Sequence, residues 1–402
     1  MSEMNQKAFT DRYNKLTGLF LKKINEEMQD RNLVFSPFSI LSMLSLLADA
    51  TAGTTRQEIT DLLYGGSMHQ GFSEQLKALR EVLTRQEMDY FYMREDEDPY
   101  FRRLICDSSE HFHTALAVFA KDSIQDTVSA DFRKYLQETY NGEMLSSADC
   151  SAALKTWGPE MTMEMLQLAE EAANSDSLMD IINTVTFDAM WQCPYERKQI
   201  KKGVFHHSDH TESKVTMLYG YADSYVENEY GTGFVNDFQQ CSYTFMVLLP
   251  KAEGPDGLRA LVETTDFHHL MKNQKSAIVH TMMPEFSVSF KENLNGIIEK
   301  LGIREAFTEH ADFSSISHAP LVADEMIHQA KIEVNRNGVK ATAASELVLV
   351  GAGLPKDEIY IMIDRPFVFA IINTILDIPV FAGVVNQIEH KRTRKRARKE
   401  EL

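Results

Sequence analysis

The segment from residue 328 to 355 constrains the fold more than any other part of the sequence, because it predicts two strands joined by a turn. Between residues 328 and 334, apolar and polar side chains alternate with the period of a half-buried strand. Asn337-Gly338 is a typical turn sequence, and from Val339 onward every second residue is again small or apolar. The second run ends in Gly-Ala-Gly-Leu-Pro, which a central strand rarely accommodates. Taken alone, this segment predicts an ordinary hairpin in a mixed sheet.

The residues that follow this hairpin resemble the C-terminal signature of the serpins. The matching stretches are Ile-Met-Ile-Asp-Arg-Pro-Phe-Val-Phe-Ala-Ile at 361–371 and Pro-Val-Phe-Ala-Gly-Val-Val-Asn at 379–386. The resemblance extends from about residue 32 to residue 386, nearly the whole chain. It implies an α+β serpin fold, with a large central mixed β-sheet, smaller sheets, about nine helices and an exposed reactive-centre loop.

The resemblance also places the loop and its scissile bond. The serpin domain would span residues 1–388, with the reactive-centre loop at about 338–360. In the family, a hinge glycine, a run of small residues, an exposed bait and a Pro-Phe strand follow one another in this order. Gly338 takes the place of the hinge glycine. The usual scissile residue, fourteen positions later, is Ala352, and it is followed by Gly353.

The residues after the hinge glycine distinguish two functions that the family contains. Inhibitory serpins insert this segment into the main sheet after cleavage. Non-inhibitory members, which act as chaperones or binding proteins, tend to carry bulky or charged side chains at the inward positions. Here the inward residues Val339, Ala341 and Ala343 are compatible with insertion, so covalent suicide inhibition of a protease is favoured and a non-inhibitory serpin is the alternative. The predicted hinge consists of Gly338, Val339, Lys340, Ala341, Thr342, Ala343 and Ala344.

The bait determines which protease the loop would attract. Residues 347–352 read Leu-Val-Leu-Val-Gly-Ala and contain no Arg or Lys. They predict a serine protease, with a cysteine protease as the alternative, whose primary pocket is small or aliphatic, as in elastase-like or subtilisin-like enzymes. The expected partner is this target protease, held as a covalent acyl complex. The chain itself is expected to be a monomer with a liability to polymerise.

Nothing in the sequence predicts enzymatic activity, a cofactor or a metal. The chain has no Gly-x-Ser-x-Gly, His-Glu-x-x-His, Walker or Rossmann motif. His206, His207 and His210 are close together, but no Cys or carboxylate stands at a matching ligand spacing, and the segment falls on a loop of the family. We therefore expect no metal site there.

A further resemblance concerns residues 32–48, in which Ser36 is a suitable helix cap and Pro37 suits the first helical turn. The helix that follows is apolar on nearly all sides and is expected to be buried. Phe-Ser-Pro-Phe-Ser-Ile at 35–40 also resembles the serpin shutter, the segment beneath the centre of the main sheet. A buried polar cluster there needs every donor satisfied. The resemblance implies a shutter composed of Ser36, Pro37, Ser39, Asn183 and His328.

The segment 181–191 is rich in β-branched residues and predicts a strand. In the family, the corresponding strand carries a shutter Asn and, eight residues later, a Trp at the breach, where the loop first inserts; Asn183 and Trp191 have this spacing. Serpins generally place a Glu two residues before the hinge glycine, paired with a Lys that follows a proline on the neighbouring strand. Here these positions hold Arg336 and Glu285, so we expect a breach ion pair with its charges exchanged. The alternative is two unrelated surface charges.

Hydrophobic spacing predicts the remaining elements. Residues 89–103 depart from the family as an added segment rich in aromatic and charged side chains. A solvated loop anchored by one or two aromatics is expected there, and a contact with a partner is the alternative. The predicted elements are helices over 8–30, 72–87, 130–140 and 152–172, and a strand over 114–119.

The charge of the chain is divided between an acidic body and a basic tail. The net charge is −18, but residues 391–402 hold seven Lys or Arg and two Glu, a net of +5, so the rest carries −23. An acidic body argues against nucleic-acid binding by the fold itself. Residues 389–402 are expected to form a basic, disordered tail beyond the family's last strand. A polyanion or nuclear-import contact through Lys391–Lys399 is the alternative.

Other features bear on the cellular compartment. The first ten residues are polar and no signal peptide is visible, so a cytoplasmic location is expected. The four cysteines are far apart and form no Cys-x-x-Cys, which favours free thiols and leaves disulfides open. No apolar run reaches membrane-spanning length, so no membrane partner is expected. The alternatives are the nucleus, from the basic tail, and the endoplasmic reticulum, since Lys399-Glu-Glu-Leu402 resembles a retention tetrapeptide.

Overall fold

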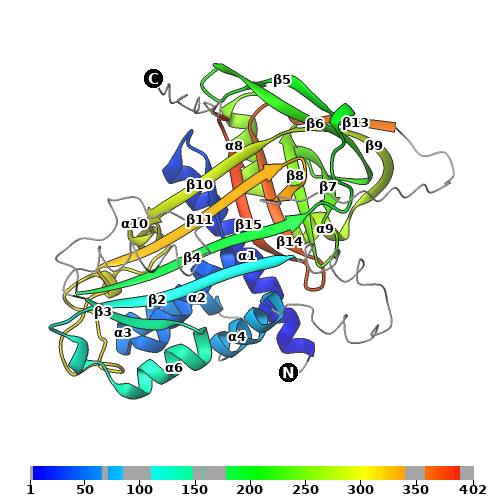
Figure 1. Cartoon of the computed structure of the whole chain (residues 1–402). Helices are drawn as coiled ribbons and strands as arrows, with labels where there is room; N and C mark the ends of the chain where they lie inside the picture. Colours follow the sequence, from blue (N-terminus) through cyan, green and yellow to red (C-terminus); the bar gives the residue numbers. More distant parts are fainter. Residues whose placement is uncertain are drawn as a thin grey trace, which may run out of the picture.

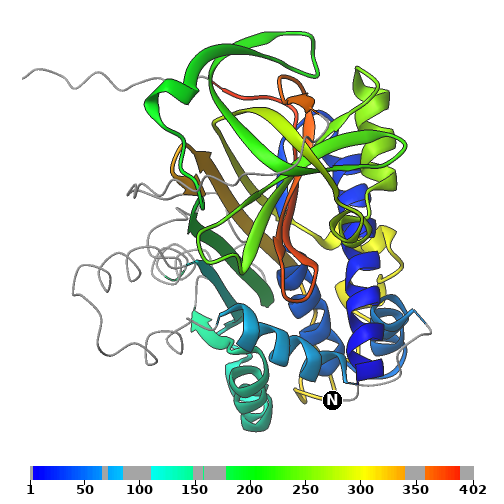
Figure 2. The ribbon, with the colours of Figure 1, turned by 90° about the vertical axis from the view of Figure 1, so that its right-hand side faces the viewer.

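The computed structural model has two mixed β-sheets that cross one another, with helices beside the smaller sheet (Figure 1). In Figure 2 the helices near the N-terminus lie together on one side of the six-stranded sheet, and the nine-stranded sheet extends above them. The structure describes residues 3–65, 71–84, 110–147, 157, 178–339 and 358–389.

The described elements follow one another along the chain as mixed α and β structure. The helices are α1 (Glu3–Met28), α2 (Pro37–Ala50), α3 (Gly53–Tyr64), α4 (Phe72–Leu83), η1 (Gln125–Thr127), α6 (Ala130–Tyr140), η2 (Arg197–Gln199), α8 (Pro255–Thr264), α9 (Phe267–Lys272), α10 (Asn295–Lys300) and η3 (Glu305–Phe307). The strands are β1 (Leu33–Phe35), β2 (His111–Lys121), β3 (Glu143–Ser147), β4 (Met179–Met190), β5 (Ile200–His206), β6 (Glu212–Glu227), β7 (Gly231–Asp237), β8 (Tyr243–Pro250), β9 (Lys275–Pro284), β10 (Phe286–Asn293), β11 (Glu325–Asn335), β12 (Gly338–Val339), β13 (Glu358–Met362), β14 (Phe367–Asn373) and β15 (Ile378–Val385).

The six-stranded sheet positions the site. Its strands follow the order β10-β11-β12-β4-β2-β3, and β12 separates β11 from β4 at one end only. Below that end, β11 and β4 pair directly and in parallel, from Glu325 with Asp180 to Lys331 with Thr186. Strands β10 and β2 flank this pair in antiparallel ladders. Figure 1 shows these long strands side by side across the front of the molecule.

The nine-stranded sheet holds the C-terminal strands in the core. Its order is β1-β15-β14-β8-β7-β6-β9-β13, with β5 paired to β6. Strand β1 near the N-terminus pairs with β15 near the C-terminus, Leu33 opposite Val384. Every residue of β8, β14 and β15 is buried. The two C-terminal signature stretches are apolar because strands covered on both faces need apolar side chains throughout.

Helix α2 contacts β4, β11 and β15, and therefore lies between the two sheets. Ser36 caps it by accepting a hydrogen bond from the Ser39 main-chain N–H at 3.3 Å, and Pro37 is its first residue. Every residue of the helix except Asp49 is buried. The predicted cap, first turn and burial of this helix are confirmed.

Most elements predicted from hydrophobic spacing are present. Strand β2 extends beyond the predicted range at both ends, because it pairs with β4 over almost its whole length. The added segment 89–103 and, except for Trp157, the predicted helix 152–172 lie outside the described residues. Helices α1, α4 and α6 and strand β2 correspond to the predicted segments 8–30, 72–87, 130–140 and 114–119.

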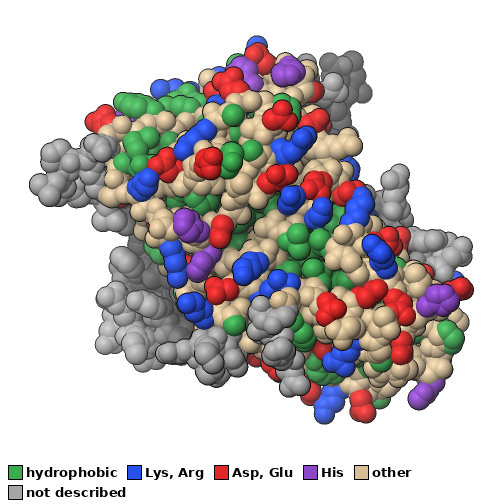
Figure 3. Space-filling view, turned by 180° about the vertical axis from the view of Figure 1, so that it is seen from behind, with side chains coloured by type: hydrophobic (Ala, Val, Ile, Leu, Met, Phe, Trp, Pro, Cys, Tyr) green, Lys and Arg blue, Asp and Glu red, His purple; other side chains and the backbone are tan. Residues whose placement is uncertain are grey.

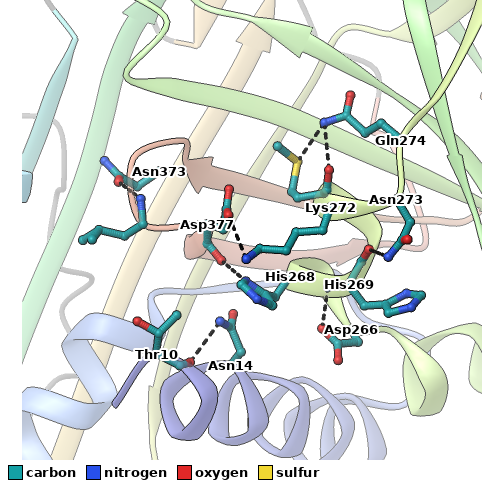
Figure 4. A network of polar contacts seen from close by, with 12 residues as sticks. Thr10, Asn14, Asp266, His268, His269, Lys272, Asn273, Gln274, Asn373 and Asp377 are labelled. Carbon is teal, nitrogen blue, oxygen red and sulfur yellow. Dashed lines mark hydrogen bonds and ion pairs between the residues drawn. The ribbon is translucent and has the colours of Figure 1, made fainter. Parts of the chain in front are cut away.

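Helix α9 fixes the turn between β14 and β15 to the rest of the core (Figure 4). Asp266 caps the helix by accepting a hydrogen bond from the His269 main-chain N–H at 2.9 Å. The ring Nδ1 of His268 lies 3.2 Å from the carbonyl oxygen of Asp377, and the Lys272 ammonium lies 3.9 Å from the carboxylate of the same residue. The helix thus holds the ends of two central strands in place.

None of the described helices is long and apolar enough to cross a membrane. Cys193 and Cys241 are free thiols at the surface, whereas Cys106 and Cys150 lie outside the described residues. For the two described cysteines, the structure agrees with the free-thiol prediction.

Candidate functional site

The candidate site begins where β12 separates β11 from β4, a place we call the fork. Gly338 and Val339 pair with Asn335 and Val334 of β11 on one side. On the other side they pair with Met190 and Ala189 of β4. Beyond Val339 the two outer strands converge and pair with each other. The fork is therefore the start of a central strand position that is filled for only two residues.

Close packing requires glycine at the head of β12. A Cβ atom on Gly338 would lie 2.0 Å from the carbonyl oxygen of Ala189 and 2.7 Å from Cα of Met190. Both are backbone atoms of β4 and cannot move without distorting that strand. Any other residue at position 338 would push β12 out of the sheet, so the residue predicted as the hinge glycine has a steric reason to be glycine.

Trp191 holds the turn that leads into β12. Its ring is fully buried and is stacked on Phe238, with 4.8 Å between centroids and 5° between planes. Its indole N–H donates to the carbonyl oxygen of Asn335 at 2.9 Å. Its main-chain N–H donates to the carbonyl oxygen of Asn337, also at 2.9 Å. Trp191 thus lies at the fork, as predicted. Phe238 was not predicted, because it is distant in sequence and lies in no motif.

Glu285 and Arg336 are in contact, but not through the predicted ion pair. The Glu285 carboxylate accepts a hydrogen bond from the main-chain N–H of Arg336 at 3.1 Å. Among the described residues no ion pair joins the two side chains, and Arg336 is exposed. The prediction was wrong in this respect because the turn directs its amide, rather than its side chain, toward the start of β10. The contact does not depend on which side chain stands at position 336.

Single replacements distinguish a main-chain contact from an ion pair. Glu285→Ala removes the acceptor and should lower the free energy of unfolding by about 1 kcal/mol. Arg336→Ala keeps the amide and should change it by less than about 0.5 kcal/mol, since the lost side chain is exposed. Thermal unfolding and polymer formation on mild heating measure both effects. In the double variant the two changes in the free energy of unfolding should add. A coupling energy above about 1 kcal/mol would instead support an ion pair between the two side chains.

The shutter residues come together in part. The main-chain N–H of Ser36 donates to His328 Nε2 at 3.1 Å, and Ser39 is bonded to Ser36 through the helix cap. Asn183 lies beside His328 in the register of β4 with β11. Its amide donates instead to Thr114 Oγ1 on β2, at 3.2 Å. Thr114 therefore belongs to this cluster, and the available signal was a hydroxyl at the first position of the predicted strand 114–119.

Three buried shutter atoms have no hydrogen-bond partner among the described protein groups. They are Ser39 Oγ, Asn183 Oδ1 and His328 Nδ1. Asn183 is turned toward β2, so the described protein groups do not by themselves satisfy this cluster. Nε2 of His328 accepts from Ser36, so we infer that the neutral ring carries its proton on Nδ1. Desolvation by complete burial lowers the pKa of His328 to about 3.

The buried neutral His328 predicts a loss of stability in acid. In the unfolded chain this ring takes up a proton near its ordinary pKa of 6.5, whereas the folded protein excludes it down to about 3. The stabilisation is therefore complete above pH 6.5 and falls as the pH decreases between these values. From pH 7 to pH 5 the free energy of unfolding should fall by about 2 kcal/mol through this residue alone. Denaturant titration at each pH measures it.

Two histidine variants provide the comparison. His328→Gln should flatten the pH dependence between pH 7 and pH 5, even if it lowers stability at every pH. His310→Gln, at an exposed position, should leave the slope as it is. The same slope in the wild type and His328→Gln would mean that other groups govern acid stability.

Two of the three histidines near β5, His206 and His207, are bonded to neighbouring side chains. His206 Nδ1 lies 3.0 Å from the Glu212 carboxylate. The two ring nitrogens of His207 lie 3.0 and 2.9 Å from the hydroxyls of Thr211 and Ser213. Within the described ranges, no group of His, Cys, Asp and Glu is arranged to hold a metal ion.

The remaining predicted residues lie outside the part of the chain that the structure describes. These are the hinge residues 340–344, the reactive bond Ala352–Gly353 and the basic run 391–399. Both ends of the predicted loop 338–360 are strands, because its first two residues form β12 and its last three begin β13.

Comparison with known proteins places this geometry in a family. A family model described as "Serpin (serine protease inhibitor)" matches residues 11–388. Iripin-2 of Ixodes ricinus is 24% identical over 395 residues, which cover 95% of this chain and 94% of that protein. Plasminogen activator inhibitor 1 of Neovison vison is 24% identical over 380 residues, 90% of this chain and 89% of that one. The crystal structure of Serpin48 from the insect Tenebrio molitor superposes with a TM-score of 0.79 at 22% identity, covering 97% of this chain and 100% of the other.

Proposed function

Because the chain belongs to the serpin family, we propose that it inhibits a serine protease with a small or aliphatic primary pocket by trapping it covalently. The observation that best supports this is the fork. A central strand position has been started by β12, and it is closed below by direct pairing of β11 with β4. An inhibitor that inserts its loop needs such a position in its uncleaved state.

The covalent step follows ordinary acyl-transfer chemistry. The protease serine attacks the carbonyl carbon of Ala352, and the peptide bond to Gly353 breaks. Gly353 leaves as a free amine after receiving the proton that the serine gave to the protease base. Ala352 remains as an ester on the protease. This ester tethers the enzyme to a chain end that is free to move.

The registers at the fork predict where the freed segment would go. At the fork, Val339 lies between Ala189 of β4 and Val334 of β11, whose residue numbers differ by 145. The direct parallel pairs have the same offset, since Glu325 lies opposite Asp180. The strands would therefore separate sideways without sliding. Continued in this register, Ala341 would lie between Phe187 and Ile332, Ala343 between Val185 and Ala330, and Ser345 between Asn183 and His328.

Insertion would exchange one weaker ladder for two stronger ones. Parallel pairs between β4 and β11 would be replaced by antiparallel pairs on both sides of the new strand. Fourteen residues at about 3.3 Å each would carry the tethered protease about 45 Å from its docking position. Distortion of its oxyanion hole would then leave the ester unhydrolysed. The uncleaved fold must be kinetically stable for this to occur.

Incubation with an elastase-like protease tests the proposal. Denaturing electrophoresis should show a stable complex that contains the protease and the chain without its released C-terminal peptide. Mass spectrometry of that peptide should give Gly353 as its first residue. A trypsin-like protease, matched in concentration, should form no complex because the bait lacks Arg and Lys. Cleavage and turnover by every small-pocket protease would favour the non-inhibitory, binding-protein function instead.

A further inference from the structure

Three aromatic rings form an exposed row across β6, β9 and β13. Tyr221 and Tyr360 lie on either side of His280 in the strand register. The His280 and Tyr360 rings are stacked, with 4.4 Å between centroids and 6° between planes, and the Tyr221 ring lies 4.9 Å from His280. We call these three residues the aromatic row. Their contacts fix the rings in one orientation; the two tyrosines stay exposed, whereas the His280 ring between them is half-buried.

The two tyrosines of the row are large hydrophobic side chains that remain exposed to solvent. Tyr221 and Tyr360 are 69% and 62% exposed. Ile278 is on the same face of β9 and is 36% exposed, and Lys201 lies over the neighbouring Tyr219 ring at 4.6 Å. In Figure 3, which shows the molecule from behind, hydrophobic side chains gather at the upper left, the corner that carries β13 in Figure 1. Aromatic side chains are enriched at the centres of protein interfaces.

The position of the row on the chain indicates what would cover it. Tyr360 is eight residues beyond Ala352, so it lies at most about 28 Å along the chain from the expected reactive bond. A protease of about 230 residues has a radius of gyration of about 17 Å and a diameter of about 45 Å. An enzyme whose catalytic serine has reached Ala352 is therefore large enough to extend over β13. A loop in a cleft supplies only part of the roughly 800 Å² per partner that stable interfaces bury.

We propose that the aromatic row is a docking surface for the protease that attacks the loop, an inference that rests on the function proposed above. The matching surface on the enzyme would be largely apolar, because the row presents two exposed phenol rings beside the Ile278 side chain. Glu358 adjoins the row, with its carboxylate 3.5 Å from His280 Nε2. Docking through such a surface prolongs the encounter and raises the rate of attack on the loop. It does not alter what happens after cleavage.

The second-order rate constant of complex formation tests this role. Tyr221→Ser with Tyr360→Ser should lower that constant by about 10- to 100-fold. The stoichiometry of inhibition should stay the same, since the loop and the fork are untouched. Tyr360→Phe should retain the wild-type rate. Ile375→Ser removes a side chain that is 67% exposed on the β14–β15 turn and should also have no effect. The ratio of the wild-type to the double-variant rate should not change with salt, because the contact is apolar.

The outcomes separate this inference from the proposed function. A stable complex that forms at the same rate with and without the row would overturn the inference alone. Absence of any complex with the wild-type chain would overturn both. A slower rate accompanied by a higher stoichiometry of inhibition would assign the two tyrosines to loop insertion and contradict docking. Size-exclusion chromatography that showed a wild-type dimer and a monomeric double variant would make the row a contact between copies of this chain, again against the proposal.

Discussion

Val339→Arg is expected to convert this chain from an inhibitor into a substrate of its target protease, so that cleaved chain replaces the stable complex. Val339 is fully buried, with Ala189 and Val334 opposite it. A guanidinium there would have no partner beneath the sheet and would destabilise the inserted strand by about 3–5 kcal/mol. Insertion would then be slower than hydrolysis of the acyl-enzyme. The stoichiometry of inhibition should rise steeply.

A second variant separates insertion from native stability. Val339 is already in the sheet before cleavage, so Val339→Arg also weakens the fork of the intact protein. Ala341→Arg places the same charge at the next inward position, beyond β12, and should abolish inhibition with no change in the thermal midpoint. Lys340→Arg, on the outward face, is the control and should inhibit normally. Titration of the protease with each variant measures the stoichiometry, and unchanged values for both inward variants would contradict insertion.

The alternation of faces is the reason that a lysine can stand between these two inward positions. In the register that β12 begins, Lys340 would lie between Asp188 of β4 and Glu333 of β11. Both carboxylates are partly exposed, on the face opposite the core. The only charged hinge residue would thus be inserted between two opposite charges. The charge of Lys340 is therefore expected to be tolerated, whereas an Arg at position 339 or 341 is expected to block insertion, because the two lie on opposite faces of the strand.

Local signals in the sequence were enough to predict the elements that build the site. Ser36 and Pro37 specify the start of α2 through the chemistry of a helix N-terminus, which needs no distant partner. Gly338 was predicted from its order relative to the other family motifs, and the structure adds the reason, a backbone contact with β4. The helix cap depends only on neighbouring residues, whereas the reason for the glycine is a contact with a strand far away in the chain.

Side-chain partners were predicted less well, because they depend on how separate strands are placed. Glu285 bonds to an amide of the turn instead of a guanidinium, and no pattern of charges in a sequence distinguishes the two. Asn183 was grouped with Ser36 and Ser39, but its amide bonds to Thr114 on β2. Phe238, one residue beyond β7, stacks on Trp191, one residue beyond β4. Each partner is selected by the register and tilt of strands that are far apart in the chain.

The unsatisfied shutter atoms and the register at the fork lead to one further expected result. Six residues beyond Val339, Ser345 would lie between Asn183 and His328, which now pair with each other. In that place its hydroxyl could donate to Asn183 Oδ1 and accept from His328 Nδ1, two atoms that have no partner among the described groups. Insertion would thereby give a protein partner to a donor and an acceptor that have none among the described groups of the uncleaved protein.

Ser345→Glu should therefore stop insertion at the shutter. A carboxylate buried beside the neutral His328 ring would destabilise the inserted strand by several kcal/mol, about as much as the charge at position 339. Ser345→Ala removes only the hydroxyl and should lower the thermal midpoint of the loop-cleaved form, with little effect on the intact protein. The outward residue Lys340 supplies the control, since Lys340→Arg should leave both the stoichiometry of inhibition and the cleaved-state stability unchanged. Normal inhibition by Ser345→Glu would show that the segment does not reach His328 in this register.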